Sequence, residues 1–185
     1  MNEVLAFIGE RIGQKGITWG LGGSLLLHYY QLIDKPNDID ILVDEKSARQ
    51  LIHTISPYGI AKAVIRSKPF QTTHFAKYKI DNIDVDIMGG FAIEHNEGLY
   101  KIAFDNESIV DHRSVRGVDI PLCSLEDWYI LYWLIPGKQV KALRIENYWK
   151  KTGVKHPNLL EKALKQSLPV EVRKRVSNLL ALENC

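Results

Sequence analysis

Apolar residues recur at helical spacing near the start of the chain. They lie three or four positions apart over residues 3–14, at Val4, Leu5, Ile8 and Ile12. Residues 17–19 then form a short β-prone run that stops at Gly20, and helical spacing resumes from Ser24 to Leu32. We therefore predict a helix, a strand, a glycine turn and a second helix.

The next segment predicts a strand followed by a helix. Pro36 disfavours helix at the residue before it, so residues 34–37 are expected to form a loop. Residues 38–43 begin as a regular alternation of acidic and apolar side chains, which is typical of a strand. Asp44 can cap a helix over residues 45–56.

Later residues change from β to helical character. The expected strands are 63–65, 73–80 and 83–88, with Asp81-Asn82 as the turn of a hairpin. Residues 89–120 are mixed, with strand candidates near 99–104 and 115–120. Ser124 and Asp127 fit the cap of an aromatic helix that runs to about Leu134. Further helices are expected near 138–151, 157–167 and 169–182.

This order of elements predicts an α/β protein with a helical C-terminal part. We expect an α/β domain over residues 1–120 and a helical C-terminal subdomain over residues 121–185. The apolar fraction of 45% suits a globular protein. Residues 1–136 carry 13 Lys/Arg against 18 Asp/Glu, whereas residues 137–185 carry 11 against 4, so an acidic body precedes a basic end.

Composition also bears on the compartment. Cys123 and Cys185 are the two cysteines, and their spacing suggests neither a disulfide framework nor a zinc site. The longest apolar run, residues 128–135, is far shorter than the roughly 18 residues that a membrane span requires. We therefore expect a cytoplasmic protein that is not embedded in a membrane.

Paired acids carry the candidate chemistry. Asp38 and Asp40 are two apart in the predicted strand, so both side chains project from the same face. Their mutual repulsion is relieved by a divalent cation, and carboxylate oxygens suit Mg²⁺. Asp84 and Asp86 alternate with apolar residues in the same way on a later strand. If that strand lies beside the first, three carboxylates can hold two metal ions for phosphoryl chemistry.

A glycine turn supplies the expected place for a triphosphate. Gly22 and Gly23 allow a ligand to approach the backbone, and Ser24 opens a helix whose free N–H groups favour anions. Each of these signals is weak alone, but their order along the chain, followed by the paired acids, is rarely met by chance.

The combined pattern resembles the nucleotidyltransferase superfamily related to DNA polymerase β. The matching motifs are Gly22-Gly23-Ser24 and Asp38-Ile39-Asp40-Ile41, and the resemblance covers residues 17–88. Within the superfamily the chain looks most like small bacterial enzymes. These include lincosamide and aminoglycoside nucleotidyltransferases and the minimal nucleotidyltransferases of toxin–antitoxin pairs.

The resemblance implies a nucleotidyltransferase fold, with a mixed central β-sheet flanked by helices, and it implies roles for individual residues. It implies that Asp38 and Asp40 bind two Mg²⁺ ions, with Mn²⁺ as an alternative, and that a third acid binds the catalytic metal and helps activate an acceptor hydroxyl. Asp86 fits that third place better than Asp84, which lies nearer the turn. Exchange of these two assignments stays open.

The C-terminal part offers further candidates. Lys138, Lys141 and Arg144 recur at helical spacing and could reach the phosphates if their helix docks over the cleft; an exposed face is the alternative. We keep Lys141 as a nucleotide-binding candidate. The aromatic side chains of residues 128–133 are expected in the core, and the alternative is that one ring borders a nucleobase or acceptor pocket.

The leading hypothesis is a nucleotidyltransferase. It would transfer a nucleoside monophosphate from a nucleoside triphosphate to a hydroxyl of a small molecule or protein, with release of pyrophosphate. The alternatives are a nucleotide-binding or antitoxin-type protein without turnover on small molecules, and a domain whose acids only decorate its surface. Extended nucleic acid is disfavoured because the net charge is only +2. A homodimer or a toxin partner stays open.

Overall fold

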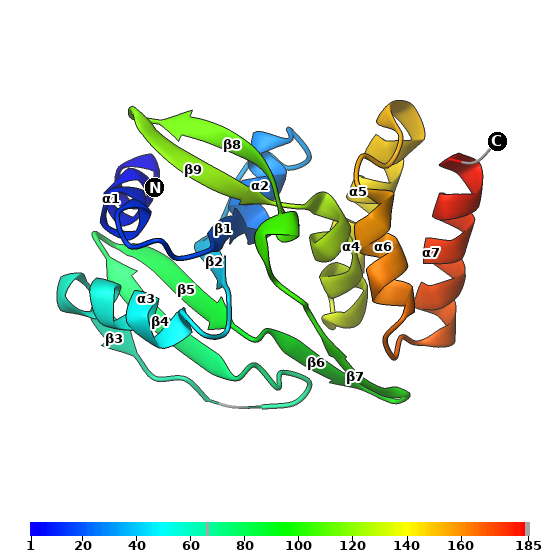
Figure 1. The fold of residues 1–185 in the computed structure, drawn as a ribbon, viewed down its shortest axis with the longest axis horizontal. Helices are drawn as coiled ribbons and strands as arrows, with labels where there is room; N and C mark the ends of the chain where they lie inside the picture. Colours follow the sequence, from blue (N-terminus) through cyan, green and yellow to red (C-terminus); the bar gives the residue numbers. More distant parts are fainter. Residues whose placement is uncertain (66, 184–185) are drawn as a thin grey trace.

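Seven strands form one mixed sheet at the centre of the molecule (Figure 1). The computed structural model describes residues 1–65 and 67–183. The strands are β1 (Trp19–Gly22), β2 (Ile39–Val43), β3 (Ile60–Lys62), β4 (His74–Ile80), β5 (Ile83–Gly89), β8 (Ile109–Val115) and β9 (Val118–Cys123). Their order across the sheet is β3-β4-β5-β2-β1-β9-β8. Because β2 runs parallel to β5 but antiparallel to β1, the expected mixed sheet is confirmed.

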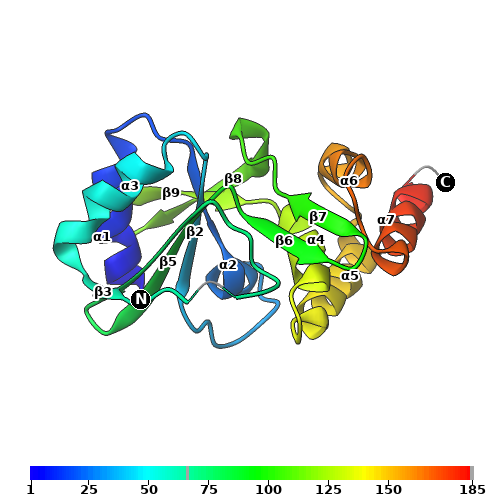
Figure 2. The same ribbon diagram turned by 90° about the horizontal axis from the view of Figure 1, so that it is seen from below.

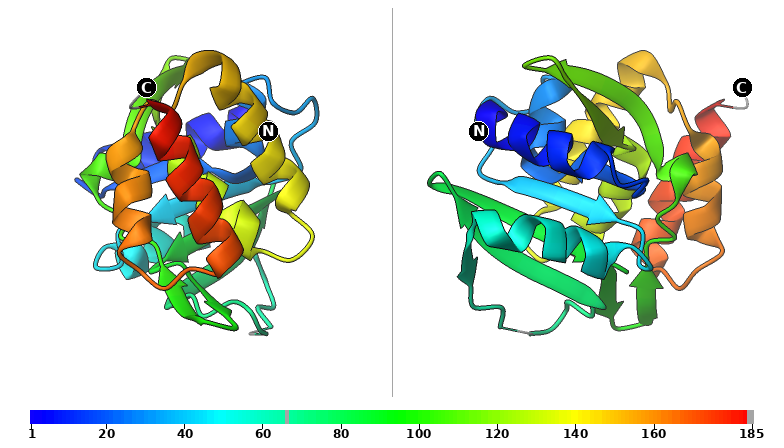
Figure 3. Two further views of the ribbon diagram at one scale, coloured as in Figure 1. Left: turned by 90° about the vertical axis from the view of Figure 1, so that its right-hand side faces the viewer. Right: turned by 60° about the vertical axis from the view of Figure 1, so that its left-hand side comes forward.

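Some helices pack on this sheet, and others form a group beyond one end of it. They are α1 (Asn2–Gly13), α2 (Gly23–Tyr29), α3 (Ala48–Ile55), α4 (Leu125–Leu134), α5 (Gln139–Thr152), α6 (Pro157–Leu164) and α7 (Val170–Glu183). Helices α1 and α3 contact each other and lie over the sheet (Figure 3). Helices α4 to α7 gather at the opposite end from the N-terminus, and α4 packs on α5 and α6 (Figure 2).

Shorter elements complete the chain. Single 3-10 turns occur at Ser56–Tyr58 and Asn106–Ser108. Strands β6 (Ala92–His95) and β7 (Gly98–Lys101) pair with each other as a separate hairpin. Cys123 is a buried free thiol, and Cys185 lies outside the described residues. Within residues 1–65 and 67–183, no helix has both the length and the apolar character that a membrane crossing needs.

Local chemistry explains the elements that the sequence predicted. The β4–β5 hairpin is confirmed, and its two turn residues, Asp81 and Asn82, adopt φ of 45° and 63° as a tight hairpin turn requires. The cap of α4 is also confirmed, because the Ser124 hydroxyl accepts a hydrogen bond of 3.0 Å from the backbone N–H of Asp127. These signals are local, so they could be recognised without the rest of the fold.

Two predicted strands were displaced. Strand β1 continues through Gly20 to Gly22 instead of stopping, because glycine is the residue that fits there: a Cβ on Gly20 would lie 2.7 Å from Cδ1 of Ile109. The strand predicted at residues 63–65 is wrong. Strand β3 occupies Ile60–Lys62, and residues 63–65 have left the sheet.

The mixed region also contained more structure than the pattern showed. Strand β9 begins later than the candidate 115–120, because Arg116 and Gly117 form a turn with φ of 54° and 82°. It continues to Cys123 and pairs with β1, so the sheet extends three residues beyond the expected boundary at residue 120. The division into two domains stays a prediction.

Candidate functional site

Three neighbouring strands bring the glycine turn and two of the aspartates into register. Gly22 of β1 lies opposite Asp40 of β2, and Asp40 lies opposite Asp86 of β5. Asp38 stands one residue before β2, at the bend where the chain enters the strand. Pairing of β2 with both β1 and β5 therefore assembles residues that are far apart in the sequence.

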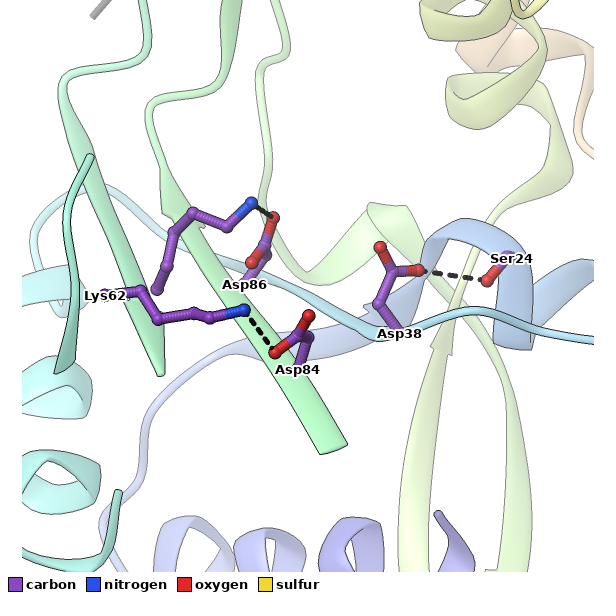
Figure 4. A network of polar contacts seen from close by, with 6 residues as sticks. Ser24, Asp38, Lys62, Asp84 and Asp86 are labelled. Atoms are coloured by element: carbon purple, nitrogen blue, oxygen red, sulfur yellow. Dashed lines mark hydrogen bonds and ion pairs between the residues drawn. The ribbon is translucent and has the colours of Figure 1, made fainter. Parts of the chain in front are cut away.

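The glycine–serine turn fits closely around the first two aspartates. Gly23 has φ of +61°, and a Cβ at this position would lie only 1.7 Å from Oδ2 of Asp40. The buried Ser24 hydroxyl donates a 3.1 Å hydrogen bond to Oδ1 of Asp38 and accepts one of 2.9 Å from the backbone N–H of Asn37 (Figure 4). In this structure the turn positions the acids, and the Ser24 hydroxyl is used within the protein.

Crowding of the carboxylates changes their acidity. Burial, together with the charges of Asp38 and Asp86, raises the pKa of Asp40 from 3.8 to about 8. Burial also raises the pKa of Asp86, although its contact with Lys77 opposes the rise. A group of acids that resists full ionisation on its own is suited to a site that binds cations.

The third acid is paired with a lysine that the sequence analysis did not single out. Lys77 of β4 places Nζ 2.9 Å from Oδ2 of Asp86, whose other oxygen, Oδ1, is buried without a hydrogen-bond partner among the described residues. Asp84 pairs with Lys62 at 2.7 Å at an exposed position nearer the start of β5 (Figure 4). The hairpin register, which sets Lys77 opposite Asp86, is the signal that could have identified this lysine.

The carboxylates are not arranged as a ready metal cluster. Over the described part of the chain, no three His, Cys, Asp or Glu side chains converge closely enough to hold an ion. Their contacts explain this, since Asp38 is drawn toward Ser24 and Asp86 toward Lys77. The donor set itself fits Mg²⁺, because it offers hard carboxylate oxygens that repel one another and one unpaired buried oxygen, Oδ1 of Asp86.

A pocket of about 430 Å³ opens beside the three aspartates, all of which line it. Lys138 and Lys141 also line it, whereas Arg144 turns away and donates a 2.7 Å hydrogen bond to the backbone oxygen of Leu32. Burial and the charge of Lys138 lower the pKa of Lys141, against the opposing effect of Asp40 and Asp38. Gly22, Gly23 and Ser24 lie behind the acids and are not among the lining residues.

Aromatic side chains of α4 divide between the pocket and the core. Trp128 and Tyr132 line the pocket, and a Cβ on Gly22 would lie 2.2 Å from the Trp128 ring, so Trp128 packs against the glycine turn. The Tyr132 hydroxyl is buried and has no hydrogen-bond partner in the described structure. Tyr129, in contrast, faces α5 and donates a 3.0 Å hydrogen bond to Glu146.

Apolar residues from the segment before β4, from β4 and β5, and from the turn after β5 complete the pocket. They include Ala63, Val64, Ile65, Phe70, Phe75, Met88 and Phe91. None of these residues was predicted from the sequence to belong to a site. Part of this segment was expected to form a strand, and an apolar run outside a sheet carries no local sign of the cavity that it borders.

Comparison with solved structures identifies similar folds. A protein from Thermotoga maritima, whose assignment as a nucleotidyltransferase is itself provisional, is 28% identical, with a TM-score of 0.59 over 80% of this chain and 92% of that chain. A lincosamide antibiotic adenylyltransferase, LnuA, bound to lincomycin, is 15% identical, with a TM-score of 0.50 over 79% of this chain and 96% of that chain. ANT(2")-Ia in complex with adenylyl-2"-tobramycin is 13% identical, with a TM-score of 0.54 over 85% of this chain and 91% of that chain.

These likenesses confirm the nucleotidyltransferase-like fold that the sequence motifs predicted. No protein-family profile and no curated protein sequence matches the chain. The two adenylyltransferase structures share the fold at low identity, so the substrates in their names do not transfer to this chain.

Proposed function

We propose that this nucleotidyltransferase-like protein transfers a nucleoside monophosphate from a nucleoside triphosphate to an acceptor hydroxyl and releases pyrophosphate. The observation that carries the proposal is the register of Asp40 with Asp86 at the edge of a pocket that Lys138 and Lys141 also line. Nucleotidyl transfer needs both features, since carboxylates hold cations at the reacting phosphorus and ammonium groups attract the polyphosphate.

Each group of pocket residues has a separate role in the proposed reaction. Asp38, Asp40 and Asp86 would hold two divalent cations, Mg²⁺ or Mn²⁺, which when bound neutralise charge at the reacting phosphate and the leaving pyrophosphate. Lys141, with Lys138 beside it, would bind the β- and γ-phosphates. The buried Tyr132 hydroxyl is free to donate a hydrogen bond to a ligand oxygen. Gly22, Gly23 and Ser24 would act on the nucleotide indirectly, by holding the first two aspartates in place from behind.

The proposed reaction is an in-line displacement. The acceptor oxygen forms a bond to the α-phosphorus while the bond from that phosphorus to the bridging oxygen breaks, and its electron pair leaves with pyrophosphate. The hydroxyl proton passes to the Asp86 carboxylate, either oxygen of which can accept it, and from there to solvent. Positioning and electrostatic stabilisation supply most of the rate.

Nucleotide binding tests the proposal without knowledge of the acceptor. Titration of the protein with each of the four nucleoside triphosphates, with and without Mg²⁺, should show binding that depends on Mg²⁺. The Asp38→Ala, Asp40→Ala double variant should lose that dependence, while the matched variant Asp84→Asn should keep it. Equal binding by wild type and the double variant would exclude the proposed centre.

A further inference from the structure

The pocket has two chemically different sides. Lys141 of α5 lies over the Tyr132 ring of α4, with its Nζ 5.1 Å from the ring centroid, so the phosphate-binding side lies next to α4 and α5. Lys77 and Phe75 belong to β4, on the far side of Asp86 in the order of the sheet. If the lysines of the α5 side hold the triphosphate, the β4 side is left for the acceptor.

The β4 side is built as an apolar platform. Phe70 stacks on Phe91 with ring centroids 6.3 Å apart and an interplanar angle of 16°. Phe91 is the buried ring of the pair, and Phe70, which stacks on it, remains 39% exposed. Phe75 lines the same side, and Ile65 is 85% exposed at its rim. Exposed rings supported by buried ones provide a surface on which a flat, apolar part of a ligand can stack.

Charge on this side is already balanced. Lys77 is paired with Asp86, and the other lining residues of the β4 side that the structure describes are uncharged. Glu94, the acid of the neighbouring hairpin, is held by Lys68 at 2.8 Å and by the Gln71 side chain at 2.9 Å. A polycationic acceptor would therefore lose hydration at its ammonium groups, while the pocket carboxylates, Asp38, Asp40 and Asp86, are assigned to the proposed cations.

We propose that the acceptor is a small, uncharged hydroxyl compound with an apolar ring face, bound against Phe70, Phe75 and Phe91. This inference rests on the proposed function, because it names the acceptor for the same centre. The volume of about 430 Å³ is near the lower end of the range for small-molecule sites and must also admit the triphosphate. It thus favours a compact acceptor over a polymer.

The experiment compares three acceptor probes with matched chemistry. Phenyl β-D-glucoside carries sugar hydroxyls and an aromatic ring, maltose carries sugar hydroxyls without the ring, and tobramycin carries hydroxyls with several ammonium groups. Binding is measured by calorimetry in the presence of Mg²⁺ and a non-hydrolysable triphosphate, and pyrophosphate release is measured separately with the natural triphosphates. We expect phenyl glucoside to bind at least about tenfold more tightly than either other probe.

Variants at the exposed part of the platform localise the effect. Phe70→Ala should weaken phenyl glucoside binding about fivefold to tenfold, and Phe70→Leu, which keeps apolar bulk, should lose less. Ile65→Asp places a carboxylate at the exposed rim and should shift the preference toward tobramycin. Triphosphate binding should stay unchanged in all three variants, which also reports that each is folded.

The outcomes separate the inference from the proposed function. Phenyl glucoside binding that depends on Phe70, without any pyrophosphate release, would support the acceptor class and contradict transfer. Preference for tobramycin or maltose, failure of phenyl glucoside to bind, or equal binding by the Phe70 variants would overturn the acceptor class. Pyrophosphate release with tobramycin or maltose, in preference to phenyl glucoside, would overturn it and leave transfer intact.

Discussion

Two lysine–aspartate pairs have their acids on the same strand, β5, and differ in burial and in the acidity of the carboxyl group. The inner pair, Lys77–Asp86, has a carboxylate that is only 12% exposed, while both side chains of the outer pair, Lys62–Asp84, are at least 40% exposed. Burial raises the pKa of Asp86, whereas the hydrogen bond from Lys62 lowers the pKa of Asp84. The contact distances, 2.9 Å and 2.7 Å, do not reveal this difference.

The difference follows from the position of each acid in the sheet. Asp86 lies opposite Asp40 within the β2–β5 ladder, whereas Asp84 precedes the first paired residues, Ile39 and Val85. Asp86 therefore shares its surroundings with other carboxylates, and Asp84 faces solvent and lysines. Two acids on one face of one strand can thus belong to different environments, and only the inner one is available to the proposed centre.

The largest expected effect separates the two acids directly. Asp86→Asn should reduce pyrophosphate release by about 10³-fold or more, because it removes a carboxylate from the reacting centre. Asp84→Asn should stay within about twofold of wild type, because its carboxylate is at the exposed rim. Steady-state rates with a responsive acceptor measure both, and comparable unfolding midpoints establish that the variants are folded. Equal losses in the two variants would contradict the distinction.

The next largest effect concerns stability and comes from the close packing of Gly23 against Asp40. Gly23→Ala should destabilise the protein by about 2–4 kcal/mol, because the added Cβ overlaps the Asp40 carboxylate and the residue must keep a positive φ. Gly13→Ala is the control, since its Cβ would meet nothing within 4 Å. Urea unfolding reports both free energies. A neutral Gly23→Ala substitution would mean that the turn does not hold Asp40 as described.

Replacement of Lys77 should destabilise the protein more than replacement of Lys62, because Lys77 is the partner of the buried acid. Lys77→Met leaves the buried Asp86 without its partner and should cost about 1–3 kcal/mol of unfolding free energy without metal. Lys62→Met removes an exposed ion pair and should cost less than about 0.5 kcal/mol. Urea unfolding in EDTA measures both. Addition of Mg²⁺ should restore more stability to Lys77→Met than to wild type, and an absence of that gain would argue against a cation beside Asp86.

Titration provides the smallest and most specific contrast. Because the pKa of Asp40 is about 8 in the fold and 3.8 ordinarily, unfolding releases a proton between these values. Metal-free stability should therefore fall as the pH rises from about 4 to about 8, by at most about 1.4 kcal/mol per pH unit, and level off above that. Unfolding curves in EDTA at several pH values measure the slope.

Two variants test whether Asp40 causes this dependence of stability on pH. Asp40→Asn should flatten it, because the titrating carboxyl is gone. Asp84→Asn should leave it unchanged, since the lowered pKa of Asp84 gives a contribution that is present at neutral pH and is lost only as the pH falls through the folded pKa. A slope that survives in Asp40→Asn would place the titrating group elsewhere.

The sequence by itself determined the local framework of this protein. The period of apolar residues marked the helices and the β4–β5 hairpin, Asp81-Asn82 marked its turn, and Ser124 marked the start of α4. The two motifs, Gly22-Gly23-Ser24 and Asp38-Ile39-Asp40, also indicated the fold that the structural comparison confirmed. These features were readable because each depends on the conformation of a few neighbouring residues.

The tertiary structure alone decided which distant residues share the site. The parallel pairing of β2 with β5 placed Asp86 beside Asp40, and the hairpin register then set Lys77 against Asp86. The departure of residues 63–65 from the sheet, and the stacking of Phe70 on Phe91, formed the apolar side of the pocket. Such contacts depend on the choice of strand partner and on long-range packing, which no local periodicity encodes.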